Sequence, residues 1–182
     1  GEVSGAEAVQ ELYSIMGIGA ENQGAVLSGG QTVLSEGQKA AVLVPEMIST
    51  GLPDIMLPVQ SEEELAAIKP DFPALSKLSE RYEVVGVHAF TVNASDGAVH
   101  CRNFAPLYAI DEEAATGTSN GALTYYLYKN GLIGECAENL FIQGEAMDRP
   151  SKIRSRLTAE SGTVKIQVGG SGVILAVGEI NL

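Results

Sequence analysis

Short β-type segments fill much of the chain, and one long helical pattern at 117–130 lies between two groups of them. Strands are predicted before the helix at 82–92 and 98–104, which read as a hairpin around the polar turn 93–97. Leu123, Tyr126 and Leu127 give the helix an apolar stripe, and Gly131 follows its end. Further strands are predicted after the helix at 140–143, 152–157, 163–168 and 173–177. This pattern predicts an α+β fold with a mostly antiparallel sheet.

The first eighty residues carry three helix-start signals. Ser4 with Glu7 and Ser61 with Glu64 have the spacing of capping boxes, and Asp71 precedes Pro73 in the first turn of a third helix. Strands are expected at 40–44 and 55–59, with a bend at 49–53 between them, and weaker strands or a loop at 25–28 and 32–34. Helices are therefore expected between the strands in the first eighty residues.

Length and charge limit the possible functions. With 182 residues and a net charge of −12, residues 1–182 are expected to form one acidic domain. The acid excess disfavours nucleic acid and anionic membranes as partners, and no run of 18 apolar residues is present that could form a membrane-spanning helix.

The absence of a recognisable signal peptide and the two cysteines favour a cytoplasmic location. Because the chain begins with Gly1 rather than Met, we expect a processed product or a fragment.

The strongest candidate site is 111–121, where an acidic segment runs into a helix start rich in Gly, Thr and Ser. Unpaired amides and the helix dipole favour an anion there, so a small carboxylate or phosphate would fit. The alternative is that Thr116 or Thr118 merely caps the helix while Glu112 and Glu113 compensate its dipole. A carboxylate beside an anion site makes functional sense if it handles a proton.

The remaining candidates favour structural roles. His88 and His100 lie in apolar strands with no evident third metal ligand nearby. Cys101 is expected in the core and Cys136 in a loop, with nothing nearby to activate either thiol. We therefore predict no metal site and no cofactor.

Six short segments form a distinctive set in this order: 49–53 (STGLP), 69–72 (KPDF), 102–106 (RNFAP), 112–119, 143–151 and 168–170. Together they resemble the PhzF family of phenazine-biosynthesis-like isomerases across roughly 45–180. The resemblance implies a diaminopimelate epimerase-like fold, in which each of two lobes wraps strands around a central helix. Our sequence resembles the second lobe, and the first lobe is expected to be absent.

The resemblance also implies site residues. The family stretch EDPATGSA matches here with Glu113, Gly117 and Thr118 at its substrate-facing positions, while Ala114 replaces the proline. Glu113 and Thr118 are the expected catalytic residues, and Thr116, Gly117, Thr118 and Arg102 are expected to bind the substrate. The glutamate and histidine that the family's first lobe supplies have no counterpart here.

The expected function is that of a cofactor-free isomerase that transfers a proton on a small carboxylate substrate between two lobes. Such a chain is expected to be inactive without the first lobe, and to form a homodimer or to pair with a companion N-terminal lobe. The alternative is a non-catalytic binding or assembly domain derived from the same fold.

Overall fold

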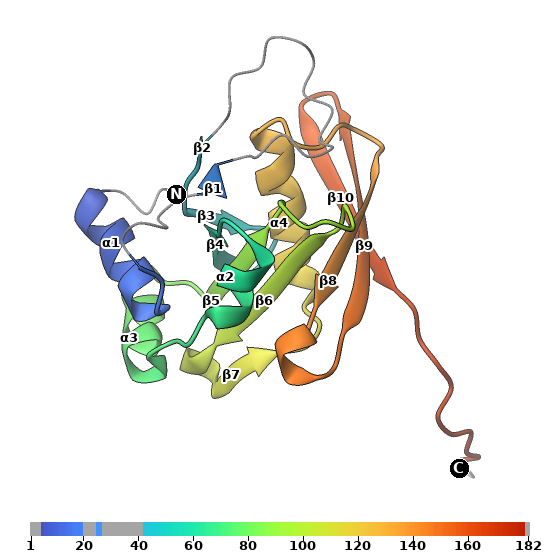
Figure 1. The fold of residues 1–182 in the computed structure, drawn as a ribbon. Coiled ribbons are helices and arrows are strands. Elements are labelled where there is room, and N and C mark those ends of the chain that lie inside the picture. The colour runs from blue at the N-terminus through green and yellow to red at the C-terminus, as the bar shows by residue number, and fades with distance from the viewer. Residues whose placement is uncertain (1–4, 20–24, 27–41, 181–182) are drawn as a thin grey trace.

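The computed structural model describes residues 5–19, 25–26 and 42–180 (Figure 1). The helices are α1 (Ala6–Ile15), α2 (Glu62–Ala67), α3 (Phe72–Tyr82) and α4 (Gly117–Lys129), with 3₁₀ turns η2 (Pro106–Tyr108) and η3 (Glu145–Met147). The strands are β1 (Ala25–Val26), β2 (Val42–Leu43), β3 (Glu46–Ser49), β4 (Pro53–Pro58), β5 (Gly86–Thr91), β6 (Val99–Ala105), β7 (Ile110–Glu113), β8 (Glu138–Gln143), β9 (Ser151–Glu160) and β10 (Thr163–Gly170).

One eight-stranded sheet organises the molecule. Its order is β10-β9-β8-β6-β5-β4-β3, and β7 also pairs with β6. All its neighbours are antiparallel except β4 with β5 and β6 with β8. The sheet curls around α4 (Figure 1). The α+β class and the largely antiparallel sheet around a central helix are therefore confirmed.

Each face of the sheet has its own core because side chains alternate along a strand. On β4, Ile55 and Leu57 pack with α1, α2 and α3, whereas Met56 packs with α4. Next to Met56 on the α4 side, Phe90 meets Tyr126 edge to face with the ring centroids 5.4 Å apart. Burial on both faces explains why β4 and β5 are almost entirely buried strands.

Local signals identified most helix starts. The Ser61 hydroxyl accepts from the Glu64 amide at 3.2 Å, and the Asp71 carboxylate accepts from the Ala74 amide at 3.0 Å. The predicted 82–92 and 98–104 hairpin is confirmed as β5 and β6, and the helix at 117–130 is confirmed as α4. Ser4 lies outside the described residues, and α1 begins after Gly5 with no side-chain cap.

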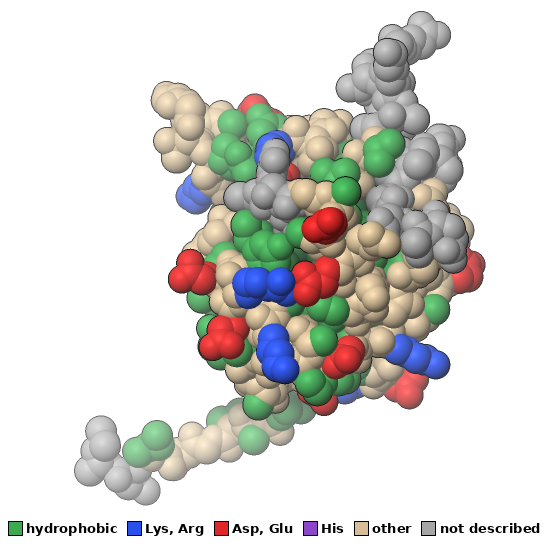
Figure 2. All heavy atoms as spheres, turned by 90° about the vertical axis from the view of Figure 1, so that its left-hand side faces the viewer, with side chains coloured by type: hydrophobic (Ala, Val, Ile, Leu, Met, Phe, Trp, Pro, Cys, Tyr) green, Lys and Arg blue, Asp and Glu red, His purple; other side chains and the backbone are tan. Residues whose placement is uncertain are grey.

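Two strand predictions were wrong. Of the strand expected at 40–44, Val42–Leu43 form β2 and Val44 lies beyond its end, while 40–41 are outside the described residues; β3 at Glu46–Ser49 was not predicted. The strand expected at 173–177 does not form, and residues 171–180 extend away from the body of the molecule (Figures 1 and 2). Five large apolar side chains there are 83–92% exposed: Val173, Ile174, Leu175, Val177 and Ile180. An apolar, β-branched run without a neighbouring strand has no ladder to join.

Gly86 is required where β5 approaches β6. A Cβ at this position would lie 1.9 Å from the Phe104 carbonyl oxygen. We expect Gly86→Ala to lower the free energy of unfolding by about 3 kcal/mol or more, since two backbones must separate. Gly134→Ala is the matched control, because its Cβ meets nothing within 4 Å, and its change should stay within about 0.5 kcal/mol. Urea denaturation measures both, and equal small effects would contradict the close approach.

Candidate active site

The first turn of α4 is the centre of the candidate site. Thr116 occupies the N-cap position in an extended conformation, but its side chain makes no bond to a helix amide. Within the described part of the chain, nothing accepts a hydrogen bond from the amides of Gly117, Thr118 or Ser119. Gly117 and Thr118 are exposed, so their amides remain available to an anion.

A buried amide side chain fixes the loop that leads into this turn. Gln143, at the end of β8, donates to the Glu113 carbonyl at 2.7 Å and to the Thr116 hydroxyl at 3.0 Å. Its oxygen accepts from the Thr116 amide at 3.2 Å and from the Asn120 side chain at 2.8 Å. Gln143 thereby uses both of its N–H groups and both of its oxygen lone pairs. The loop therefore has one defined conformation relative to the helix.

Gly144 allows the turn after β8 to lie against the same loop. Its φ is +89°, and a Cβ would lie 2.4 Å from the Arg149 carbonyl oxygen and 2.8 Å from that of Ala114. Only glycine combines this backbone conformation with such a close approach. Sequence reasoning treated 143–151 as a polar connection and missed its role in holding the 113–116 loop.

Two other segments border the helix start. The Thr50 hydroxyl, in the bend after β3, donates to the Thr118 carbonyl at 3.3 Å. Val168 of β10 lies over the helix, where a Cβ on Gly121 would be 3.4 Å from its side chain. The bend at 49–53 and the end of β10 are thus parts of the site's border.

Glu113 and Glu112 point to opposite faces of the sheet. Glu113 pairs with Asn103 across β6 and β7, and Asn103 contacts Ser119 of α4, so Glu113 shares the face on which α4 lies. Its carboxylate is exposed and makes no bond to another described side chain. The structure therefore places Glu113 on the same side as Thr116, Gly117 and Thr118.

Arg102 lies on the opposite face. Its guanidinium donates to both carboxylate oxygens of Glu112, at 2.9 and 2.7 Å, and to three backbone carbonyls at the end of α2. The structure does not bring Arg102 to the start of α4, and its expected part in substrate binding stays a prediction. Its bonds to Glu112 hold β7, the strand that carries Glu113, against α2.

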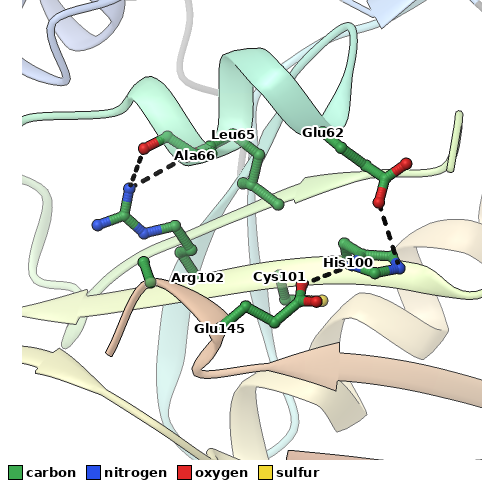
Figure 3. Close-up of a pocket in the computed structure, with 8 residues that line it drawn as sticks. Glu62, Leu65, Ala66, His100, Cys101, Arg102 and Glu145 are labelled. Atoms are coloured by element: carbon green, nitrogen blue, oxygen red, sulfur yellow. Dashed lines mark hydrogen bonds and ion pairs between the residues drawn. The ribbon is translucent and has the colours of Figure 1, made fainter. Parts of the chain in front are cut away.

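Arg102 instead lines a cavity of about 340 Å³ between α2, β6 and η3 (Figure 3). His100 forms part of this cavity, with Nδ1 2.6 Å from Glu145 and Nε2 3.2 Å from Asp96 and 3.7 Å from Glu62. Burial lowers the pKa of His100, but the Glu145 and Asp96 carboxylates outweigh it and raise the pKa above its usual value. The ion pairs of His100 with these carboxylates therefore stabilise the fold below pH 6.5. This stabilisation is lost as the pH rises through the raised pKa of His100.

A row of buried polar side chains lies beneath α4. Ser119 donates to the Asp54 carboxylate at 2.6 Å and accepts from the Asn103 side chain at 3.1 Å. The same Asn103 nitrogen is 3.1 Å from His88 Nδ1. All four side chains are almost fully buried. Sequence reasoning expected a structural role for His88 but did not predict this row, because its strand members lie within otherwise apolar strands.

The two cysteines lie in different environments. Cys101 is buried, as expected, and burial raises the pKa of its thiol well above the usual value, whereas Cys136 is exposed. Across residues 5–19, 25–26 and 42–180, no three His, Cys, Asp or Glu side chains are arranged to hold a metal ion. None of the described helices combines the length and apolarity needed to cross a membrane.

His88 makes a testable contribution to stability. Burial lowers its pKa to about 4. Between about pH 6.5 and 4, this histidine therefore binds a proton in the unfolded chain but not in the folded chain. Stability should fall as pH drops through this window, by up to roughly 3 kcal/mol from this residue. Urea denaturation at pH 7 and pH 4.5 should show a smaller drop for His88→Gln than for the wild type. Equal drops would contradict the burial of a neutral imidazole.

Comparison with known proteins agrees with this architecture. Residues 20–178 match the PhzC-PhzF family of phenazine biosynthesis-like proteins. An uncharacterized isomerase of Deinococcus radiodurans is 35% identical over 131 residues, covering 69% of this chain and 42% of the relative. The trans-2,3-dihydro-3-hydroxyanthranilate isomerase of Pseudomonas chlororaphis is 30% identical over 142 residues, covering 76% and 45%. The matched part of the chain thus covers less than half the length of these curated relatives.

A solved structure shows the same fold. The Bacillus anthracis phenazine biosynthesis protein of the PhzF family superposes with a TM-score of 0.71 at 17% identity, over 94% of this chain and 54% of that one. The family match covers most of the sequence, and this structural likeness covers almost all of it. The chain therefore belongs to the PhzC-PhzF family of phenazine biosynthesis-like proteins.

Proposed function

We propose that this chain is the second lobe of a PhzF-like isomerase that moves a proton on a small carboxylate substrate without a cofactor. The observation that carries the proposal is the free Glu113 carboxylate on the face where the Gly117 and Thr118 amides are unpaired. An anion-binding helix start beside an unpaired acid is suited to holding a carboxylate while a proton is transferred nearby. Family membership supports isomerase chemistry, since the relatives are named isomerases.

Each residue then has a distinct role. The Gly117 and Thr118 amides and the Thr118 hydroxyl hold the substrate carboxylate, and Thr116 orders the turn through Gln143. Glu113 donates a proton to the substrate or forms a hydrogen bond with it. The Pseudomonas chlororaphis relative is named for trans-2,3-dihydro-3-hydroxyanthranilate, an amino carboxylate, which supports this substrate class.

A second group must complete the reaction. Proton relocation needs an acceptor as well as a donor, and the matched part of this chain covers less than half of the relatives' length. We assign the second group to a companion N-terminal lobe, with the active site in the cleft between the lobes. The cytoplasm is the proposed location. A non-catalytic binding domain is the second candidate, because the available amides at the start of α4 would also suit binding alone.

Substitutions at the helix start test the chemistry. The chain should show no turnover alone, and a polypeptide carrying the first lobe should restore deuterium incorporation from solvent into trans-2,3-dihydro-3-hydroxyanthranilate. Glu113→Gln should then lower kcat about a hundredfold or more, because the acid is lost. Thr118→Ala should lower kcat/KM about tenfold, because a charge-assisted hydrogen bond is lost.

Asp111→Asn is the matched control, since Asp111 is an exposed acid on the same strand. Restored turnover that survives both Glu113→Gln and Thr118→Ala would rule out the proposed site. Carboxylate binding without turnover in the presence of the first lobe would favour the binding domain.

The exposed segment at 171–180 supports association with a companion lobe or a second copy. Contiguous apolar side chains of this size are rarely left in water, and an extended segment can add to an open sheet edge. On the side of the molecule that carries α1 and α3, Figure 2 shows acidic and basic side chains interspersed, with no single basic patch.

Light scattering tests the association. The isolated chain should show a mass above 19.0 kDa that increases with concentration. The double substitution Ile174→Asp and Leu175→Asp should shift the chain to a monomer, because two charges oppose apolar burial. Ser171→Asp, an exposed polar position at the start of the same segment, serves as the control and should leave association unchanged. A wild-type monomer at every concentration would contradict this expectation.

A further inference from the structure

The buried polar row beneath α4 ends directly behind the candidate anion site. Ser119 follows Thr118 in the sequence, and its hydroxyl points down to the sheet, where it meets Asp54 of β4 and Asn103 of β6. Asp54 is 2% exposed and Ser119 is 2% exposed. The first turn of α4 is thus tied to two strands from below.

The hydrogen-bond directions along this row are determined by the groups present. The Ser119 hydroxyl has one hydrogen, which it donates to Asp54, so it accepts from Asn103 Nδ2. The second hydrogen of that nitrogen faces His88 Nδ1, which is therefore the acceptor. His88 consequently carries its proton on Nε2. A single consistent pattern fixes the orientation of Ser119.

This row is costly to stability. Asp54 and His88 are almost fully buried, and burial raises the pKa of Asp54 and lowers that of His88, because each loses hydration of its charged form. Well-packed apolar side chains often fill such buried positions at a lower cost in free energy. The row is therefore better explained by the orientation it imposes than by the stability it adds.

We propose that Asp54 and Asn103, with His88 behind them, are positioning residues that hold Ser119 so that the Gly117 and Thr118 amides face the substrate carboxylate. This inference rests on the proposed function for the role of those amides. Asp54 acts only through Ser119 and does not touch the substrate. Exact placement of binding groups matters, since small displacements far from the chemistry weaken binding and catalysis strongly.

Two alanine substitutions separate positioning from packing. Asp54→Ala removes the sheet-side partner of the Ser119 hydroxyl. Ser155→Ala is the matched control, because Ser155 is the buried sheet-side partner of Thr124 on the same helix, at 2.6 Å. Asp54→Asn is the conservative variant, since its carbonyl oxygen can still accept from Ser119.

The readouts are the NMR backbone signals of Gly117 and Thr118 in the free full chain, and the affinity for anthranilate as a carboxylate probe. Asp54→Ala should move both signals and weaken anthranilate binding about tenfold or more. Asp54→Asn should keep the affinity within about twofold. Ser155→Ala should leave the signals and the affinity unchanged.

The outcomes distinguish this inference from the proposed function. Unchanged Gly117 and Thr118 signals in Asp54→Ala, or equal shifts in Ser155→Ala, would overturn the positioning role. If the wild type binds no anthranilate, the proposed anion site fails, while the signals of the free protein still decide the positioning role. If Asp54→Ala does not fold, Ser119→Ala is used instead, because it removes the hydroxyl that joins Asp54 and Asn103. The shift of the Gly117 backbone signal is then measured in that variant.

Discussion

The hydrogen bonds of the buried Gln143 side chain join the parts of the candidate site. They connect the end of β8 to the Glu113 carbonyl, to both polar groups of Thr116 and to Asn120 of α4. Without this amide, the Glu113 carbonyl and both polar groups of Thr116 would lose a partner, at about 0.5–1.5 kcal/mol for each hydrogen bond. Because the loop precedes the first turn of the helix, the position of the exposed amides depends on it.

Helix α4 has two tasks, carried by different side chains. Its buried polar side chains, Ser119, Asn120 and Thr124, are each bonded to the sheet or to the loop. Leu123, Tyr126 and Leu127 are buried in the apolar core. Apolar burial supplies most of the stability, while directional hydrogen bonds set the orientation of the end that faces the site. A helix with apolar residues throughout would be held as firmly but oriented less specifically.

Local signals in the sequence were sufficient for the parts of the fold that depend on neighbouring residues. The caps at Ser61 and Asp71 and the start of α4 follow from short-range chemistry. The acidic strand β7 could not be predicted, because its pairing with β6 comes from tertiary contacts rather than from β propensity. The strand prediction at 173–177 was wrong for the reverse reason: the segment has a high β propensity, but no adjacent strand is described.

The candidate site was predictable in part. The segment 111–121 indicated the helix start and its acids, and the family resemblance singled out Glu113 and Thr118. Strand pairing was needed to separate Glu113 from Glu112 and to place Arg102 on the other face. His88 was expected to have a structural role, but nothing in the sequence linked it with Asp54, Asn103 and Ser119, because one polar residue in an apolar strand does not reveal which helix residue it will meet.

A crystal structure of the chain soaked with a small aromatic carboxylate tests the central claim most directly. The account predicts the carboxylate at the start of α4, within hydrogen-bond distance of the Gly117 and Thr118 amides and on the side of Glu113. A carboxylate bound elsewhere, such as in the cavity beside His100 and Arg102, with the helix start free, would contradict it.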